Sequence, residues 1–287
     1  MGGDLFRQNR REVRIMKISL CTISFRHELV SLPELARWAG ENHFDGIELW
    51  GVHALKLSDT PVRSLEIARA HGVAFSMLSD YFALHGDEAR VMRRAEQIFR
   101  IARQMEVGKI RTFAGGRPSR EMSGQDREEV CRRLCKLCEA AGDLKLVVEI
   151  HPNTLADTLE STLELIERVD HPALRINFDV LHVWESGADP VDAFRRLRGH
   201  VAHLHLKNVR SRRDLTVFDP ANVYSASGIR EGMTPLFEGV YDYERFLSEI
   251  TPDDDLDASL EWFGDNAREV LKADRLHLAN ARGLAVV

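Results

Sequence analysis

The sequence contains no apolar run near the roughly 18 residues of a membrane-spanning helix, and its N-terminus lacks the apolar stretch of a secretory signal. An excess of basic residues is also missing, because 39 Lys and Arg against 45 Asp and Glu leave a net charge of -6. That balance disfavours a nucleic-acid partner. Cysteine is scarce, with 4 in 287 residues, and reduced thiols suit a cytoplasmic protein. We therefore predict a cytoplasmic protein without a membrane or nucleic-acid partner.

Two local features resemble metal sites but have simpler interpretations. Cys131, Cys135 and Cys138 recur at helical spacing in "CRRLCKLC". This spacing is compatible with a metal site, but it also describes one buried helical face, which is the interpretation we favour. The acidic run "PDDDLD" at 252–257 lacks the spacing of a calcium loop, so we predict a solvated turn.

Short β-like runs alternate with amphipathic helical segments along the whole chain, within an ordinary globular composition of 44% hydrophobic and 29% charged residues. The predicted strands are 17–23, 46–50, 73–79, 109–115, 145–151, 174–180, 201–208 and 258–264. Helical patterns cover 31–42, 61–71, 87–106, 126–141 and 156–168. Eight alternating units favour a single α/β domain, a (β/α)8 TIM barrel, with an open doubly wound sheet as the alternative.

The domain boundaries follow from the same pattern. Residues 1–15 are polar and rich in arginine, and we predict that they form a disordered N-terminal extension. The barrel then occupies residues 16–287, because no composition break or repeat divides them. The irregular segment 209–240 follows the seventh strand, and loops of this length inside a domain are usually functional. We therefore predict a lid or a substrate-binding loop there.

Ionisable and polar residues gather near the ends of the predicted strands, where the active sites of TIM barrels are built. They are Glu48, Tyr81, Arg111, Glu149, His151, Asn177, Asp179, His205, Lys207 and Glu261. A single buried histidine or glutamate is more often a satisfied core residue than a functional one. A purely structural role is less convincing for the whole set, because its members converge on one end of one barrel.

A metal site follows from the last four strands. Glu149, Asp179 and Glu261 would repel one another strongly unless a cation lay among them, and His205 adds an imidazole. Three carboxylates and one imidazole suit one divalent ion, Mn²⁺ or Mg²⁺ with Co²⁺ as a further candidate. His182, three residues after Asp179, is a candidate outer partner or substrate contact.

Because side chains alternate along a strand with a period of two, the direction of the residues beside the ligands can also be predicted. In "VAHLHLKN" (201–208) His205 faces the metal, Lys207 lies nearer the mouth towards substrate, and His203 lies deeper with a structural role. In "EIH" Glu149 holds metal, and His151 is placed as a general base beside it. A bound metal ion with a base nearby can catalyse enolisation.

These residues resemble the xylose isomerase-like barrel superfamily of sugar isomerases, epimerases and endonuclease IV. A closer resemblance rests on longer strings, among them "SLCTISFRHELVS", "DGIELWG", "HPNTLADTLESTLEL" and "SLEWFGDNA". They are similar to the bacterial 3-dehydroshikimate dehydratases, of the single-domain type that supplies 3,4-dihydroxybenzoate for siderophores such as petrobactin. The likeness runs from about Met16 to about Ala279.

The resemblance implies a Mn²⁺- or Mg²⁺-dependent lyase that dehydrates 3-dehydroshikimate, a small carboxylate, to protocatechuate. It implies the four metal ligands named above, His151 as the base, and Arg111, Lys207 and Tyr224 as substrate contacts. The substrate-binding candidates are Glu48, Tyr81, Asn177, His182 and Tyr224. Either Arg111 or Lys207 could hold the substrate carboxylate. The family likeness also suggests a homodimer.

Three other functions were weighed. A ketose or sugar epimerase would use the same metal site, but with a pair of glutamates as acid and base and without the histidine two residues after Glu149. A repair endonuclease would need further metal-binding histidines and a basic groove, which the net charge of -6 argues against. A catalytically inactive binding module should have lost metal ligands, yet all four are present.

Overall fold

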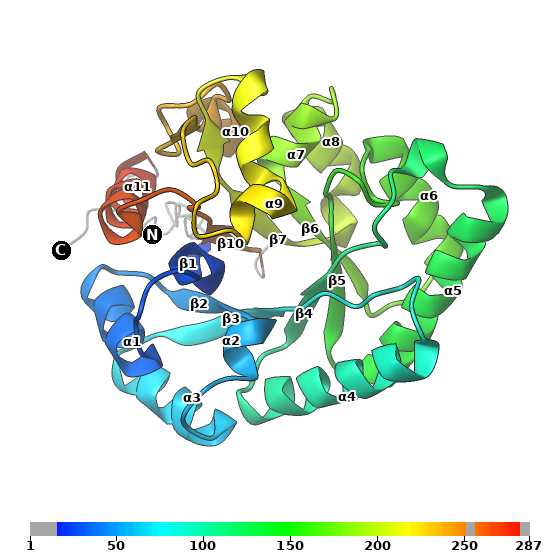
Figure 1. Ribbon diagram of the computed structural model, residues 1–287. Helices are drawn as coiled ribbons and strands as arrows, with labels where there is room; N and C mark the ends of the chain where they lie inside the picture. Colours follow the sequence, from blue (N-terminus) through cyan, green and yellow to red (C-terminus); the bar gives the residue numbers. More distant parts are fainter. Residues whose placement is uncertain (1–15, 251–255, 282–287) are drawn as a thin grey trace, which may run out of the picture.

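The computed structural model describes residues 16–250 and 256–281, and eight of its strands close into a parallel barrel (Figure 1). Around the barrel these strands follow the order β1-β10-β7-β6-β5-β4-β3-β2. Their bounds are β1 (Lys17–Cys21), β2 (Gly46–Trp50), β3 (Ala74–Ser79), β4 (Lys109–Thr112), β5 (Lys145–Glu149), β6 (Leu174–Asp179), β7 (Val201–Leu206) and β10 (Asp257–Leu260). Because β1 pairs with both β2 and β10, the sheet has no open edge. The predicted (β/α)8 barrel is confirmed, and the open-sheet alternative is excluded.

Helices surround the barrel and cover the outer face of its strands (Figure 1). The longer ones are α1 (Leu32–Glu41), α3 (Pro61–Ala70), α4 (Glu88–Gln104), α5 (Gly124–Ala141), α6 (Leu159–Val169), α8 (Pro190–Leu197), α10 (Tyr243–Glu249) and α11 (Ala267–Ala281). Short helices are α2 (Gly51–Ala54), α7 (Val180–Glu185), α9 (Pro220–Val223), η1 (Thr22–Phe25), η2 (Ser119–Glu121), η3 (Arg198–His200) and η4 (Arg212–Phe218). Among the described residues no helix combines the length and apolarity needed to cross a membrane.

Local sequence signals explain where these helices begin and which face they bury. A capping box of Ser123 and Asp126 starts α5, because each side chain accepts a hydrogen bond from the other's backbone N–H. On the same helix Cys131 and Cys138 are buried in the core with Leu134, as the helical-face interpretation predicts. Residues 1–15 and residues 252–255 of the acidic run lie outside the described residues.

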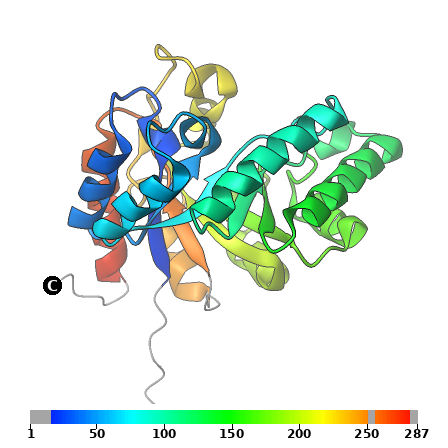
Figure 2. The same cartoon turned by 90° about the horizontal axis from the view of Figure 1, so that it is seen from below.

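The strands end earlier than predicted at the carboxyl end of the barrel. β5 ends at Glu149 rather than at 151, and β10 ends at Leu260 rather than at 264. After β5 the chain turns into its loop at His151, whose N–H donates to the carbonyl of Ala156. The segment 209–240, yellow in Figure 2, rises at one end of the barrel and contains a two-stranded antiparallel sheet of β8 (Asn208–Val209) and β9 (Met233–Thr234).

Candidate active site and metal centre

Four buried side chains meet at the carboxyl end of the barrel. Glu149 ends β5, Asp179 ends β6, His205 lies in β7, and Glu261 follows β10. His205 Nδ1 lies 3.5 Å from Glu261 Oε1, 3.6 Å from Glu149 Oε1 and 3.9 Å from Asp179 Oδ2. The structure therefore brings Glu149, Asp179 and His205 close enough together to hold one metal ion, with Glu261 beside His205.

Glu48 fixes the orientation of the His205 imidazole. Its Oε2 lies 2.9 Å from His205 Nε2, so Nε2 donates and Nδ1 is left facing the three carboxylates. Nδ1 is buried and has no hydrogen-bond partner among the described residues. Burial alone would lower the pKa of His205, but Glu261 and Glu48 raise it well above its ordinary value. The cluster thus favours positive charge beside Nδ1, and its donor set fits a divalent metal ion.

Glu48 and Asn177, both predicted to contact substrate, lie in the interior of the barrel. Neither lines the pocket, and both side chains are fully buried. Asn177 lies two residues before Asp179 on β6, so it occupies the layer below Asp179, and it is in register with His203 of β7 and Glu149 of β5. Glu48 contacts His205, Asn177 belongs to the barrel interior, and the substrate contact of each stays a prediction.

His203 forms part of that lower layer. Its Nε2 is 2.7 Å from Ser259 Oγ and 3.6 Å from Glu48 Oε2, and its Nδ1 is 3.5 Å from Lys109 Nζ. The Lys109 ammonium is paired in turn with Asp257 Oδ2 at 2.6 Å. Both imidazole nitrogens therefore have protein partners, which supports the predicted structural role of His203.

Lys207 stands beside the ligand cluster in the wall of the pocket. Its Nζ lies 2.6 Å from Asp179 Oδ2 and 2.8 Å from Glu261 Oε2. Burial opposes its charge, but Asp179 and Glu261 keep the pKa of Lys207 above its ordinary value. The rings of Phe218 and Phe263 lie 5.0 and 5.8 Å from Nζ. Lys207 is thus a permanent cation whose strongest contacts go to two of the ligands.

Arg111 provides a second buried cation on the opposite wall. Its Nε lies 3.0 Å from Glu149 Oε2, and its guanidinium lies 5.2 and 5.0 Å from the ring centres of Tyr81 and Phe113. Its Nη1 atom is buried without a hydrogen-bond partner in the part of the chain that the structure describes. Arg111 therefore has an unused donor in a residue that lines the pocket.

Two imidazoles, those of His151 and His182, border the pocket with ring centroids 4.5 Å apart. His151 Nδ1 is 2.8 Å from the carbonyl of Pro152, which can only accept, so the hydrogen lies on Nδ1 and Nε2 keeps its lone pair. Burial, followed by His182, lowers the pKa of His151 to about 3, so the ring is neutral at neutral pH. His182 Nδ1 contacts Glu185 Oε2 at 2.8 Å.

The pocket above the cluster joins these groups to an aromatic and apolar wall. Its lining consists of Ile23, Tyr81, Arg111, Phe113, Glu149, His151, His182, Lys207, Phe218, Pro220, Val223, Tyr224, Glu261 and Phe263. Phe218, Pro220, Val223 and Tyr224 come from segment 209–240, so this segment forms part of the pocket, as a lid or substrate loop would. Sequence reasoning missed Phe113, although it follows Arg111 by two residues and the strand period could have found it.

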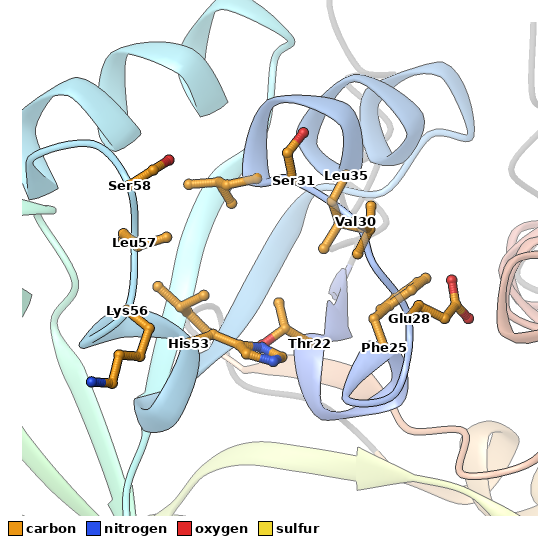
Figure 3. A pocket seen from close by; sticks show the side chains of 12 residues that line it. Thr22, Phe25, Glu28, Val30, Ser31, Leu35, His53, Lys56, Leu57 and Ser58 are labelled. Carbon is orange, nitrogen blue, oxygen red and sulfur yellow. The ribbon is translucent and has the colours of Figure 1, made fainter. Parts of the chain in front are cut away.

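A second cavity lies beside η1 (Figure 3). Thr22 and Phe25 of η1, with His53, Lys56 and Leu57, line it, whereas Ile23 between them lines the first pocket. The hydroxyl of Thr22 accepts from the Trp50 N–H at 2.8 Å and contacts His53 Nδ1 at 3.0 Å. None of the predicted catalytic or metal-binding residues reaches this cavity.

The comparisons with known proteins agree with this geometry. The family model described as xylose isomerase-like TIM barrel matches residues 35–281. A curated 3-dehydroshikimate dehydratase from Bacillus anthracis is 48% identical over 95% of this chain and 99% of its own length.

Solved structures extend the comparison. A crystal structure of a probable 3-DHS dehydratase involved in petrobactin synthesis, also from Bacillus anthracis, superposes with a TM-score of 0.88 at 46% identity and covers 92% of this chain and 99% of that one. A xylose isomerase-like TIM barrel protein from Mycobacterium smegmatis, solved in complex with magnesium, gives a TM-score of 0.69 at 18% identity and covers 95% of this chain and 99% of that one.

Proposed function

The chain belongs to the xylose isomerase-like TIM barrel family, and from this premise we propose that it is a 3-dehydroshikimate dehydratase. This carbon–oxygen lyase removes water from 3-dehydroshikimate to give protocatechuate. The near full-length relative at 48% identity supports the substrate assignment. The structural relative named for petrobactin synthesis supports a role in supplying protocatechuate for a siderophore.

The observation that carries the proposal is the free Nε2 of His151 beside the ligand cluster. Glu149 leads directly into the loop that carries His151, so the base stands next to the cation position. When bound by the four ligands, a divalent ion would polarise the ketone oxygen of the substrate. His151 then takes the ring proton that is next to the departing hydroxyl and conjugated through the alkene to the ketone. The hydroxyl leaves as water after gaining a proton, and transfer of the proton from the carbon beside the ketone to the ketone oxygen then makes the ring aromatic.

We assign the substrate carboxylate to Arg111 rather than to Lys207. The Lys207 ammonium already makes two short contacts, at 2.6 and 2.8 Å, with metal ligands. Arg111 has the unpartnered Nη1, and a guanidinium can hold a carboxylate through two parallel hydrogen bonds. Tyr81, Tyr224 and His182 line the same pocket and complete the proposed substrate contacts.

For the metal we propose Mn²⁺ or Mg²⁺. Three carboxylates with a single imidazole form a hard donor set that suits these ions, and no thiolate takes part among the described residues. A fold neighbour solved with magnesium gives further support. The enzyme is proposed to work in the cytoplasm, on a small carboxylate and without nucleic acid, as a homodimer.

A direct assay tests the function. Chelator-treated protein is mixed with 3-dehydroshikimate, and protocatechuate is followed by its ultraviolet absorbance before and after Mn²⁺ or Mg²⁺ is restored. We expect product only after restoration. If folded, metal-loaded protein makes none and instead interconverts a ketose from a panel of sugars, the epimerase alternative replaces the dehydratase.

A further inference from the structure

Arg26, the residue that follows η1, connects three separate segments around the pocket mouth. Its Nη1 donates to the carbonyl of Ile23 at 3.2 Å, its Nη2 to that of Phe263 at 3.1 Å, and its Nε to that of Val223. The guanidinium also lies 5.0 Å from the centre of the Phe263 ring. Ile23, Val223 and Phe263 all line the pocket, whereas Arg26 itself does not.

A second arginine holds the same turn from the other side. Arg230 donates through Nη1 to the carbonyl of Asn222 and through Nη2 to that of Ser225 at 2.5 Å. Together the two guanidinium groups donate hydrogen bonds to backbone carbonyls of residues before and after Tyr224. The Tyr224 ring lines the pocket and stacks on Trp50, with centroids 6.1 Å apart and planes at 16°.

This part of the chain depends on such outside contacts for its shape. The helix before Tyr224, α9, has four residues, far below the length at which a helix holds itself in water. The Tyr224 side chain is 47% exposed, so burial anchors it weakly. Charge-assisted hydrogen bonds to a partly buried guanidinium are among the stronger local restraints available.

We propose that Arg26 is a positioning residue that holds segment 218–225 closed over the pocket and so sets the place of Tyr224 against the substrate. The substrate part of this inference rests on the proposed function, whereas the closure part does not. Arg26 acts through the Val223 and Phe263 carbonyls, one in the covering segment and one in the loop after β10. It thereby links the first and last strand-to-helix loops of the barrel to the covering segment.

Hydrogen–deuterium exchange tests the closure without any substrate. In Arg26→Met, we expect peptides from 219–232 to exchange faster than in the unmodified protein, with the barrel strands unchanged. Arg175→Met is the matched control, because Arg175 likewise donates to backbone carbonyls, those of Pro172 and Leu174, but at the start of β6. Equal exchange of 219–232 in all three proteins would overturn the closure.

Kinetics test the link to Tyr224. Arg26→Met should raise KM by roughly 10-fold, the size expected for one charged hydrogen bond, with a smaller change in kcat. Arg26→Lys should recover part of the loss, and Arg175→Met should leave KM unchanged. In a Tyr224→Ala background the Arg26→Met effect should largely disappear.

The two tests can fail separately. Independent, multiplying effects of Arg26→Met and Tyr224→Ala on KM would refute positioning through Tyr224. If the unmodified, metal-loaded protein does not dehydrate 3-dehydroshikimate, the proposed function fails, and the exchange experiment still decides whether Arg26 closes the segment.

Discussion

Two layers of the barrel interior contain the same residue type on the same face of β7 and use it differently. His205 in the upper layer has one nitrogen on Glu48 and leaves Nδ1 unpartnered within 3.5–3.9 Å of three carboxylates. His203, two residues earlier, has protein partners for both nitrogens. The comparison teaches that the surrounding charges, rather than the residue type, decide whether an interior histidine is a ligand or a structural group.

The pKa values of the two histidines are shifted in opposite directions. Burial lowers the pKa of His203 to about 4, so its ring is neutral. At His205 the surrounding carboxylates overcome burial and raise the pKa well above its ordinary value. His203 is therefore satisfied by protein partners alone, whereas the carboxylate cluster around His205 would gain from a bound cation.

The largest expected effect is that of removing a ligand charge from the upper layer. Glu261→Gln should weaken Mn²⁺ binding by more than the roughly 10- to 100-fold that loss of an outer partner costs, and dehydration should fall with it. Calorimetric titration of the metal and the ultraviolet assay check this. Glu244→Gln, a change at an exposed carboxylate of α10, serves as the control. Unchanged Mn²⁺ affinity in Glu261→Gln would remove Glu261 from the ligand set.

The next effect separates chemistry from metal binding at the same end of the barrel. His151→Ala should lower kcat by about 10²- to 10⁴-fold, the usual contribution of a general base, while Mn²⁺ affinity and the circular dichroism spectrum stay the same. Near-normal turnover in this variant would show that another group takes the ring proton.

A third variant acts at the boundary between the layers. Glu48→Gln keeps a side-chain oxygen near His205 Nε2 but removes the charge that orients the imidazole. We expect a roughly 10- to 100-fold loss of Mn²⁺ affinity, measured by calorimetry, with a smaller effect than in Glu261→Gln. A loss equal to or greater than that of Glu261→Gln would instead make Glu48 a ligand.

The smallest functional effect is expected in the lower layer, where the consequence is pH-dependent stability. Folded His203 has a pKa of about 4 against an ordinary 6.5, so it binds fewer protons folded than unfolded between these values. Its contribution to the free energy of unfolding is full above pH 6.5 and falls as the pH drops to 4, by about 3 kcal/mol. When the free energy of unfolding is measured by urea at several pH values, His203→Gln should lack this part of the pH dependence. An identical slope in both proteins would contradict the neutral assignment.

The sequence allowed the barrel, and the convergence of the candidate ligands on one end of it, to be predicted because both follow from the period of strands. Glu149, Asp179 and His205 each lie at or near the end of a recognisable strand, and parallel strands end at one rim. The same period could not place Glu48 against His205, because it gives the face of a residue but not its depth within the barrel.

Loop residues were harder to predict. Arg26 and Phe218 lie outside regular strands, where no period relates spacing to direction. Their contacts depend on how segments far apart in the chain pack, as in the bond from Arg26 to Val223. The segment 209–240 could be recognised as functional from its length, but the residues that it turns towards the pocket could not.

The most direct measurement compares Mn²⁺ binding in His205→Gln and His203→Gln by calorimetry, after both are shown to be folded. The account predicts one ion per chain in the unmodified protein and in His203→Gln, and an affinity lower by more than about 100-fold in His205→Gln. Equal affinities in the two variants, whether both high or both low, would contradict the assignment of separate roles to the two layers.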